Sequence, residues 1–183
     1  VEGMPGSATY NYTSNTDTFW GSDEDDLFVA ERLDQVQSGD MAFGNDGFDT
    51  VRFLFPVSNI TTTLRDQIEN TGFDSIERVE FVTERPVFMD GIGLGYLPDL
   101  EELATGNGSD ELLNMRQNIL YELNAGDDFI SMAWDSFNDK DETTVDGGSG
   151  IDTVELPAPW GWVGPMPWNW GYLPWMSDEL AIK

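Results

Sequence analysis

The chain has 183 residues and contains neither cysteine nor histidine. Without cysteine it can form no disulfide, no thiolate metal site and no cysteine nucleophile. Without histidine it can build no Ser-His-Asp triad, no HExxH zinc site and no acid–base pair that uses imidazole. These two absences exclude several of the commonest catalytic and metal-binding arrangements.

Basic residues are scarce as well. Eight Lys and Arg stand against 35 Asp and Glu, which gives a formal net charge of −27. Because nucleic acid requires a basic face, we exclude nucleic acid as a partner, and anionic membrane surfaces with it. The sequence has no run of 18 apolar residues, so we expect no membrane span. Without cations the acidic side chains should repel one another and destabilise the compact state.

Many of these acidic residues occupy fixed places in glycine-rich turns. Residues 147–155 read GGSGIDTVE and fill every defined position of the nonapeptide G-G-x-G-x-D-x-U-x, where U is a large apolar residue. Glycine permits the left-handed backbone angles of such a turn, which direct carbonyl oxygens toward one point. The aspartate adds a carboxylate, and this set of hard oxygen ligands suits Ca²⁺. The residues that follow predict a short strand with an inward apolar side chain.

Degenerate copies of this motif recur along the chain, at 21–28, 44–51, 71–76, 106–112 and 125–130. The key aspartates of the six copies are Asp26, Asp49, Asp74, Asp110, Asp128 and Asp152, with spacings of 23, 25, 36, 18 and 24 residues. Two nonapeptides, about 18 residues, make one coil of a β-roll. We therefore predict an all-β fold, an interrupted parallel β-roll or β-solenoid, with calcium-binding glycine–aspartate turns on one edge and irregular loops on the other. Residues 111–123 have helical propensity, but the repeat register predicts strands there.

On these motifs the chain resembles the RTX, or haemolysin-type, calcium-binding family of bacterial proteins exported by type I secretion. The resemblance covers about residues 18–156 and includes a segment, 49–81, of the form DTVxF, a strand, then DTLxNVExLxF. It differs from a uniform RTX block because only one repeat is complete. The resemblance implies several bound Ca²⁺ ions and a secreted, extracellular or cell-surface location. The expected metal-binding residues are Asp23, Asp26, Asp46, Asp49, Asp74, Gly108, Asp110, Gly126, Asp127, Asp128, Gly148, Gly150 and Asp152.

The two ends of the chain differ in composition from this central roll at 18–156. Residues 1–17 read as a polar arm with a short edge strand near Tyr10 and Tyr12. Residues 157–183 form a tail rich in proline, which excludes helix interiors and central strands. Its tryptophans are Trp160, Trp162, Trp168, Trp170 and Trp175. They could cap the open end of the roll, anchor a neighbouring subunit or stack against sugar rings; we favour self-association.

Three functions fit the sequence. The first is a non-enzymatic secreted module, ordered by Ca²⁺, that acts in adhesion or surface assembly as a homo-oligomer, filament or surface layer. The second is a calcium-stabilised carbohydrate-binding module that uses the tryptophan-rich tail on an extracellular glycan. The third is the accessory domain of a secreted polysaccharide-active enzyme. Paired carboxylates can hydrolyse glycosides, but every acidic cluster here is explained by a calcium turn or a solvated loop, so we expect no catalytic residues.

Overall fold

The computed structural model describes residues 6–55, 72–90, 97, 99–116, 118–133, 143–155 and 180–182. This part of the chain consists mostly of short strands, with one 3₁₀ helix, η1 (Leu33–Gln35). All strand pairings in it are parallel. The predicted all-β, parallel class is confirmed. The tryptophans of the tail lie outside the described residues.

The strands form one long sheet and two short sheets. The long sheet contains β1 (Thr9–Asn11), β3 (Leu27–Ala30), β5 (Thr50–Phe53), β7 (Arg78–Phe81), β9 (Glu102–Ala104), β11 (Leu120–Glu122), β13 (Thr143–Asp146) and β15 (Leu180–Ile182). The N-terminal short sheet contains β2 (Thr18–Trp20), β4 (Met41–Phe43) and β6 (Gly72–Asp74). The C-terminal short sheet contains β8 (Phe88–Asp90), β10 (Glu111–Met115), β12 (Phe129–Met132) and β14 (Thr153–Glu155).

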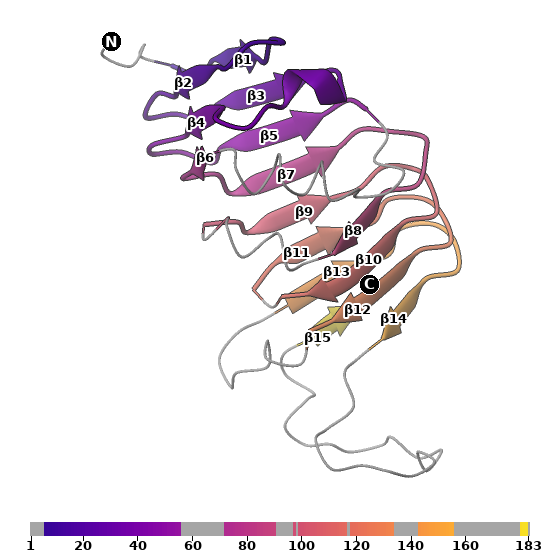
Figure 1. The fold of residues 1–183 in the computed structure, drawn as a ribbon. Helices are drawn as coiled ribbons and strands as arrows, with labels where there is room; N and C mark the ends of the chain where they lie inside the picture. The colour runs from indigo at the N-terminus through magenta and orange to yellow at the C-terminus, as the bar shows by residue number, and fades with distance from the viewer. Residues whose placement is uncertain are drawn as a thin grey trace, which may run out of the picture.

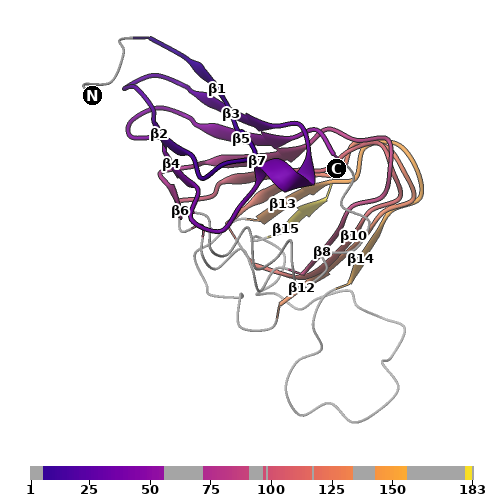
Figure 2. The ribbon, with the colours of Figure 1, turned by 45° about the horizontal axis from the view of Figure 1, so that its top comes forward.

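Odd-numbered strands belong to the long sheet and even-numbered strands to one of the short sheets. The chain therefore alternates between the long sheet and a short sheet. The strands stack in sequence order from the N-terminal to the C-terminal end (Figure 1). The two short sheets lie toward opposite edges of the long sheet (Figure 2). The switch from one short sheet to the other occurs between β6 and β8.

The core lies between these sheets and follows from the two-residue period of a strand. In β5 and β7 every second side chain is buried, and Val51 pairs with Val79 while Phe53 pairs with Phe81. The rings of Phe53 and Phe81 stack with centroids 5.2 Å apart. Like residues in register on neighbouring coils therefore form ladders through the core.

The alternate, outward positions of the long sheet carry charge. Arg52 donates to Glu80 at 2.8 Å, and Arg78 bridges Glu102 and Glu122 on the two following strands. Arg52–Glu80 and Arg78–Glu102 place opposite charges directly across neighbouring strands, where they stabilise the register.

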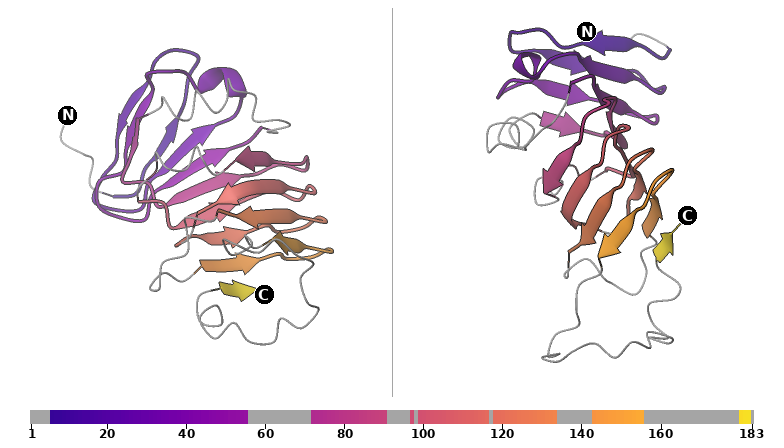
Figure 3. Two further views of the ribbon diagram at one scale, coloured as in Figure 1. Left: turned by 60° about the horizontal axis from the view of Figure 1, so that its bottom comes forward. Right: turned by 90° about the vertical axis from the view of Figure 1, so that its right-hand side faces the viewer.

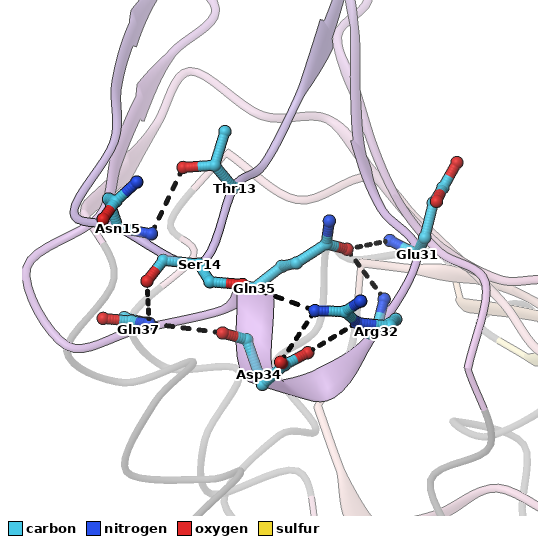
Figure 4. A network of polar contacts seen from close by, with 8 residues as sticks. All are labelled: Thr13, Ser14, Asn15, Glu31, Arg32, Asp34, Gln35 and Gln37. Carbon is cyan, nitrogen blue, oxygen red and sulfur yellow. Dashed lines mark hydrogen bonds and ion pairs between the residues drawn. The ribbon is translucent and has the colours of Figure 1, made fainter.

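Two local predictions are confirmed. Thr9–Asn11 form the edge strand β1 in the polar arm, and residues 111–123 form β10 and β11 rather than a helix. The connection between β3 and β4 is longer than the tight turns described below and is held by polar contacts (Figure 4). In it Arg32 pairs with Asp34 at 2.8 Å, and the Gln35 side chain accepts the backbone N–H of Glu31.

Candidate cation sites in the glycine turns

Two stacks of tight turns carry the glycine–aspartate motifs. The first stack, residues 21–26, 44–49 and 75–77, leads from the N-terminal short sheet into the long sheet. The second stack, residues 105–110, 123–128 and 147–152, leads from the long sheet into the C-terminal short sheet. Because the strands of the long sheet are parallel, turns that enter it and turns that leave it lie at opposite edges (Figure 3).

The prediction that all these turns share one edge is therefore wrong. A coil contains two turns, and the residue spacing between aspartates does not say which of them is tight. In the N-terminal coils the tight turn precedes the long-sheet strand, whereas in the C-terminal coils it follows that strand. Between Asp74 and Asp110 the chain passes from one edge of the long sheet to the other. Their spacing of 36 residues therefore does not measure two coils.

A ladder of carboxylates connects successive coils within each stack. In the first stack the backbone N–H of Asp26 donates to Asp49 Oδ1, and that of Asp49 donates to Glu77 Oε2, both at 2.7 Å. In the second stack the N–H of Asp110 donates to Asp128 Oδ1 at 2.7 Å, and that of Asp128 donates to Asp152 Oδ1 at 3.1 Å. Each of these carboxylates is thereby fixed in position by the coil before it.

Asp74 is not part of this ladder. It is exposed at the end of β6, where it pairs with Phe43. The position that aligns with Asp26 and Asp49 belongs to Glu77, which the motif search missed because it required aspartate. The signal that could have found Glu77 is the strand after it, since RVEF at 78–81 repeats the pattern of TVRF at 50–53.

The acidic residues at the turn tips are exposed, unlike the ladder residues Asp26, Asp49, Asp110 and Asp128. Asp23 and Asp46 lie at the surface of the first stack. Asp127 is exposed too, and its Oδ1 accepts the backbone N–H of Ile151 from the next coil at 3.0 Å. Asp25 makes the equivalent contact to Phe48 at 2.9 Å, although the sequence motif did not single it out.

Three of the ladder aspartates, Asp49, Asp110 and Asp128, are deeply buried and only partly hydrogen-bonded, whereas Asp152 at the last turn is exposed. Asp49 is 0 % exposed, and Asp110 and Asp128 are 2 % exposed. One carboxylate oxygen of each, Oδ2, has no hydrogen-bond partner in the described part of the chain. A buried charge without a hydrogen-bond partner destabilises the fold, so a proton or a bound cation would stabilise these oxygens.

The pKa values of these groups reflect their burial. Loss of solvent raises the pKa of Asp49 to about 6, against a smaller lowering by the backbone N–H of Asp26 and with a further increase from Glu77. Burial likewise raises the pKa of Asp128 to about 6, and the neighbouring carboxylates of Asp110 and Asp152 add to the increase. Burial also raises the pKa of Asp110.

The glycines of the turns make room for oxygen atoms. A Cβ on Gly44 would overlap both the Asp49 carboxylate and the carbonyl oxygen of Ser75. A Cβ on Gly126, whose φ is 152°, would overlap the carbonyl oxygen of Gly108 and contact the Asp128 carboxylate. At each edge, a carboxylate of the same turn and a backbone carbonyl of a neighbouring coil therefore both lie close to the place where a glycine lacks a Cβ.

The second stack repeats this arrangement in its last turn. Gly150 has a φ of 148°, and a Cβ there would overlap the carbonyl oxygen of Gly126. Gly148, with a φ of 73°, faces the carbonyl oxygen of Asn124 in the same way. The glycines expected from the motif thus lie in one stack with Asp110, Asp128 and Asp152.

This donor set fits a hard cation such as Ca²⁺, because it consists of carboxylate and carbonyl oxygens. Among the described residues, no three acidic side chains form a group that could hold a metal ion by themselves. A cation in these turns would therefore take one or two carboxylates, with backbone carbonyls supplying other ligands. The candidate ligands are the Asp49 carboxylate and Ser75 carbonyl at one edge, and the Asp128 carboxylate and Gly108 carbonyl at the other.

An acidic groove of about 950 Å³ adjoins the first stack. Asn45 and Ser75 line it together with Glu77, Asp99 and Glu101. Burial raises the pKa of Glu77, and the charges of Asp99 and Glu101 raise it further. The negative field of this groove favours the approach of cations to the first stack.

The described part of the chain contains no helix long and apolar enough to cross a membrane. Comparison with protein-family models, curated proteins and solved structures finds no match to this chain.

Proposed function

We propose that this protein is a secreted structural module that Ca²⁺ orders and that acts in extracellular or cell-surface assembly and adhesion. The observation that carries the proposal is the buried carboxylate oxygen of Asp49 and of Asp128 that lacks a hydrogen-bond partner in the described residues. Each residue belongs to a glycine turn in which a backbone carbonyl of a neighbouring coil lies close to the carboxylate group.

In this proposal the parallel strands form an interrupted β-roll. The alternation between long and short sheets, the register of the ladders and the stacked turns support it. The RTX resemblance supports it from the sequence. Each coil then contributes ligands to the gap between itself and its neighbour, as expected of a solenoid whose units contact only adjacent units.

Calcium would supply the positive charge that the turns lack. With a net charge of −27 and buried carboxylates, the calcium-free chain is destabilised by repulsion and by desolvation. Because the sites draw ligands from different coils, they do not exist in the unfolded chain, and the free energy of calcium binding becomes free energy of folding. The module is thus loose where calcium is scarce and ordered where it is abundant.

An extracellular location follows from the same chemistry. Calcium sites in extracellular modules bind with dissociation constants of about 10⁻⁴–10⁻³ M, which match calcium levels outside cells. Type I export is the route that the RTX resemblance implies. No catalytic residue is assigned.

Circular dichroism of the purified chain in a chelator and in millimolar calcium tests the proposal, together with calorimetric calcium stoichiometry. We expect a calcium-dependent gain of β-structure, a higher melting temperature and binding of more than one ion. Identical spectra and melting temperatures in the two buffers, with no measurable calcium binding, would overturn it.

A further inference from the structure

The outer face of the N-terminal short sheet carries an apolar patch. Trp20 is 54 % exposed and Met41 is 38 % exposed, and Phe43 is partly buried beside them. Trp20 pairs with Phe43 across β2 and β4, so the two side chains project from the same face. Their rings stack with centroids 4.1 Å apart and planes 13° apart. We call Trp20, Met41 and Phe43 the Trp20 patch.

The Trp20 patch differs from the other exposed apolar side chains of the described residues because it contains a stacked pair of aromatic rings. Of the remaining large ones, Leu33 lies in η1 and Ile151 in a turn, whereas Leu54 and Val82 follow the paired residues Phe53 and Phe81 at the ends of β5 and β7. The Trp20 indole is held by Phe43, and the Trp20 carbonyl accepts the Tyr10 hydroxyl at 2.8 Å. A rigid, half-exposed tryptophan is the typical centre of a protein–protein interface.

A second apolar feature is attached to the opposite end of the molecule. β14 is the last strand of the C-terminal short sheet and β15 is the last strand of the long sheet. Both strands lie at the C-terminal end of the stack (Figure 3), and residues 156–179 connect them in the sequence. Residues 156–177 contain five tryptophans and no charged residue, in a chain whose net charge is −27.

We propose that the Trp20 patch receives the tryptophan-rich connection, residues 156–179, of a second copy of this chain. The proposal rests on the assembly role given above and specifies the surface that performs it. Within one molecule the patch and the strands that flank the connection lie at opposite ends of the stack (Figure 1). Head-to-tail stacking of two copies brings the last coil of one against the first coil of the next.

Charge and symmetry support the same arrangement. Two copies of an acidic chain repel each other over most of their surfaces, and the Trp20 patch and residues 156–177 of the connection contain no charged residue, so the copies can meet there. The long sheet begins with β1 and ends with β15 in a parallel order, so translation along the stack continues it in the same direction. Such a contact joins two different surfaces and therefore builds an open filament rather than a closed dimer.

Sedimentation velocity in calcium tests the proposal with two variants. Trp20→Ser removes the centre of the patch, and replacement of Trp160, Trp162, Trp168, Trp170 and Trp175 by serine removes the connection's anchors. We expect the wild type to form a series of oligomers and each variant to associate roughly tenfold or more weakly. Leu54→Ser, a change at a residue of 41 % exposure away from the patch, is the matched control and should associate like the wild type.

A mixture of the two variants gives the decisive result. Each variant keeps one half of the contact, so an equimolar mixture should form dimers and nothing larger. A mixture that stays monomeric, a Trp20→Ser variant that assembles like the wild type, or a wild type that is monomeric at high concentration in calcium each overturns the proposal. Loss of oligosaccharide binding in Trp20→Ser without any change in sedimentation would instead assign the patch to sugar, and overturns it as well. Circular dichroism of every variant in calcium separates these results from a failure of calcium-dependent folding.

Discussion

Replacing Asp49 and Asp128 together by asparagine should have opposite effects with and without calcium. In a chelator at pH 7, both carboxylates are buried charges with an oxygen that lacks a partner in the described residues, so the double variant should be more stable than the wild type. In calcium the same charges become cation ligands, and the double variant should be less stable.

The magnitude follows from the pKa values. Burial raises the pKa of each carboxyl from 3.8 to about 6 in the folded chain. Each pKa unit corresponds to about 1.4 kcal/mol, so each group costs the calcium-free fold roughly 3 kcal/mol once ionised. The two groups lie in different stacks, so their contributions should add to roughly 6 kcal/mol at most.

The sign of the pH dependence is fixed by the same shift. Below pH 3.8 both states of the chain hold the proton, and the stability associated with these groups is fully present. Between pH 3.8 and about 6 the unfolded chain has lost the proton while the folded chain retains it, so stability falls as pH rises. In a chelator the wild type should therefore become more folded on acidification from pH 7 to pH 4.

Urea denaturation followed by circular dichroism from pH 4 to pH 7.5 measures the effect. The double variant should show a much flatter profile in chelator than the wild type. Asp46→Asn is the control, because it removes an exposed charge of the same stack and should leave the slope unchanged. Wild-type stability in chelator that rises from pH 4 to pH 7, or a double variant equally destabilised with and without calcium, would refute the reasoning.

Three further predictions concern single residues. Gly126→Ala should lower the free energy of unfolding in calcium by about 3 kcal/mol or more, because the new Cβ overlaps the Gly108 carbonyl; Gly72→Ala, whose Cβ meets only the flexible Met41 side chain, should cost far less in the same denaturation assay. Glu77→Gln should weaken calcium binding in calorimetry more than Asp74→Asn does, and the reverse order would restore the sequence-based register. Asp128→Ala should lower the calcium stoichiometry, whereas Asp26→Ala should not, because both Asp26 oxygens already accept backbone N–H groups from Ala8 and Ser22; equal stoichiometries would contradict this assignment.

The repeat register predicted the strands well because each repeat ends in a strand that pairs with the equivalent strand of the neighbouring coil. Residues 111–123 show this most clearly, since their helical propensity is overridden by the strands β10 and β11 on either side of a short link. Parallel pairing with neighbouring coils supplies hydrogen bonds and inward packing that a lone helix would lack. Tertiary contacts of this kind routinely outweigh intrinsic propensity.

The edge on which each turn lies could not be read from the sequence. Asp49 and Asp110 follow similar glycine motifs, yet one precedes a long-sheet strand and the other precedes a short-sheet strand. The difference arises from where the longer connections fall, between β3 and β4 in the N-terminal coils but between β8 and β9 and between β12 and β13 farther along. The number of residues between successive aspartates is the sum of both connections of a coil, so it does not show which connection is the longer one.

Glu77 escaped detection for a different reason. The motif is defined by aspartate, which has a short side chain. The ladder requires only a carboxylate oxygen that can accept the backbone N–H of the preceding coil. Glu77 reaches the Asp49 N–H at 2.7 Å with its longer side chain. A search for acidic residues placed directly before matching strands would have found it.

The ladders also determine how calcium would act on the whole chain. Asp49 and Asp128 each accept the N–H of the preceding coil with one oxygen and leave the second oxygen for a cation. Ordering one turn therefore positions a ligand for the next site, and binding within a stack should be cooperative. The two stacks share no ladder residue and lie at opposite edges of the long sheet. Their coupling must pass through the packed strands of that sheet, so the N-terminal and C-terminal coils can be ordered by calcium in separate steps.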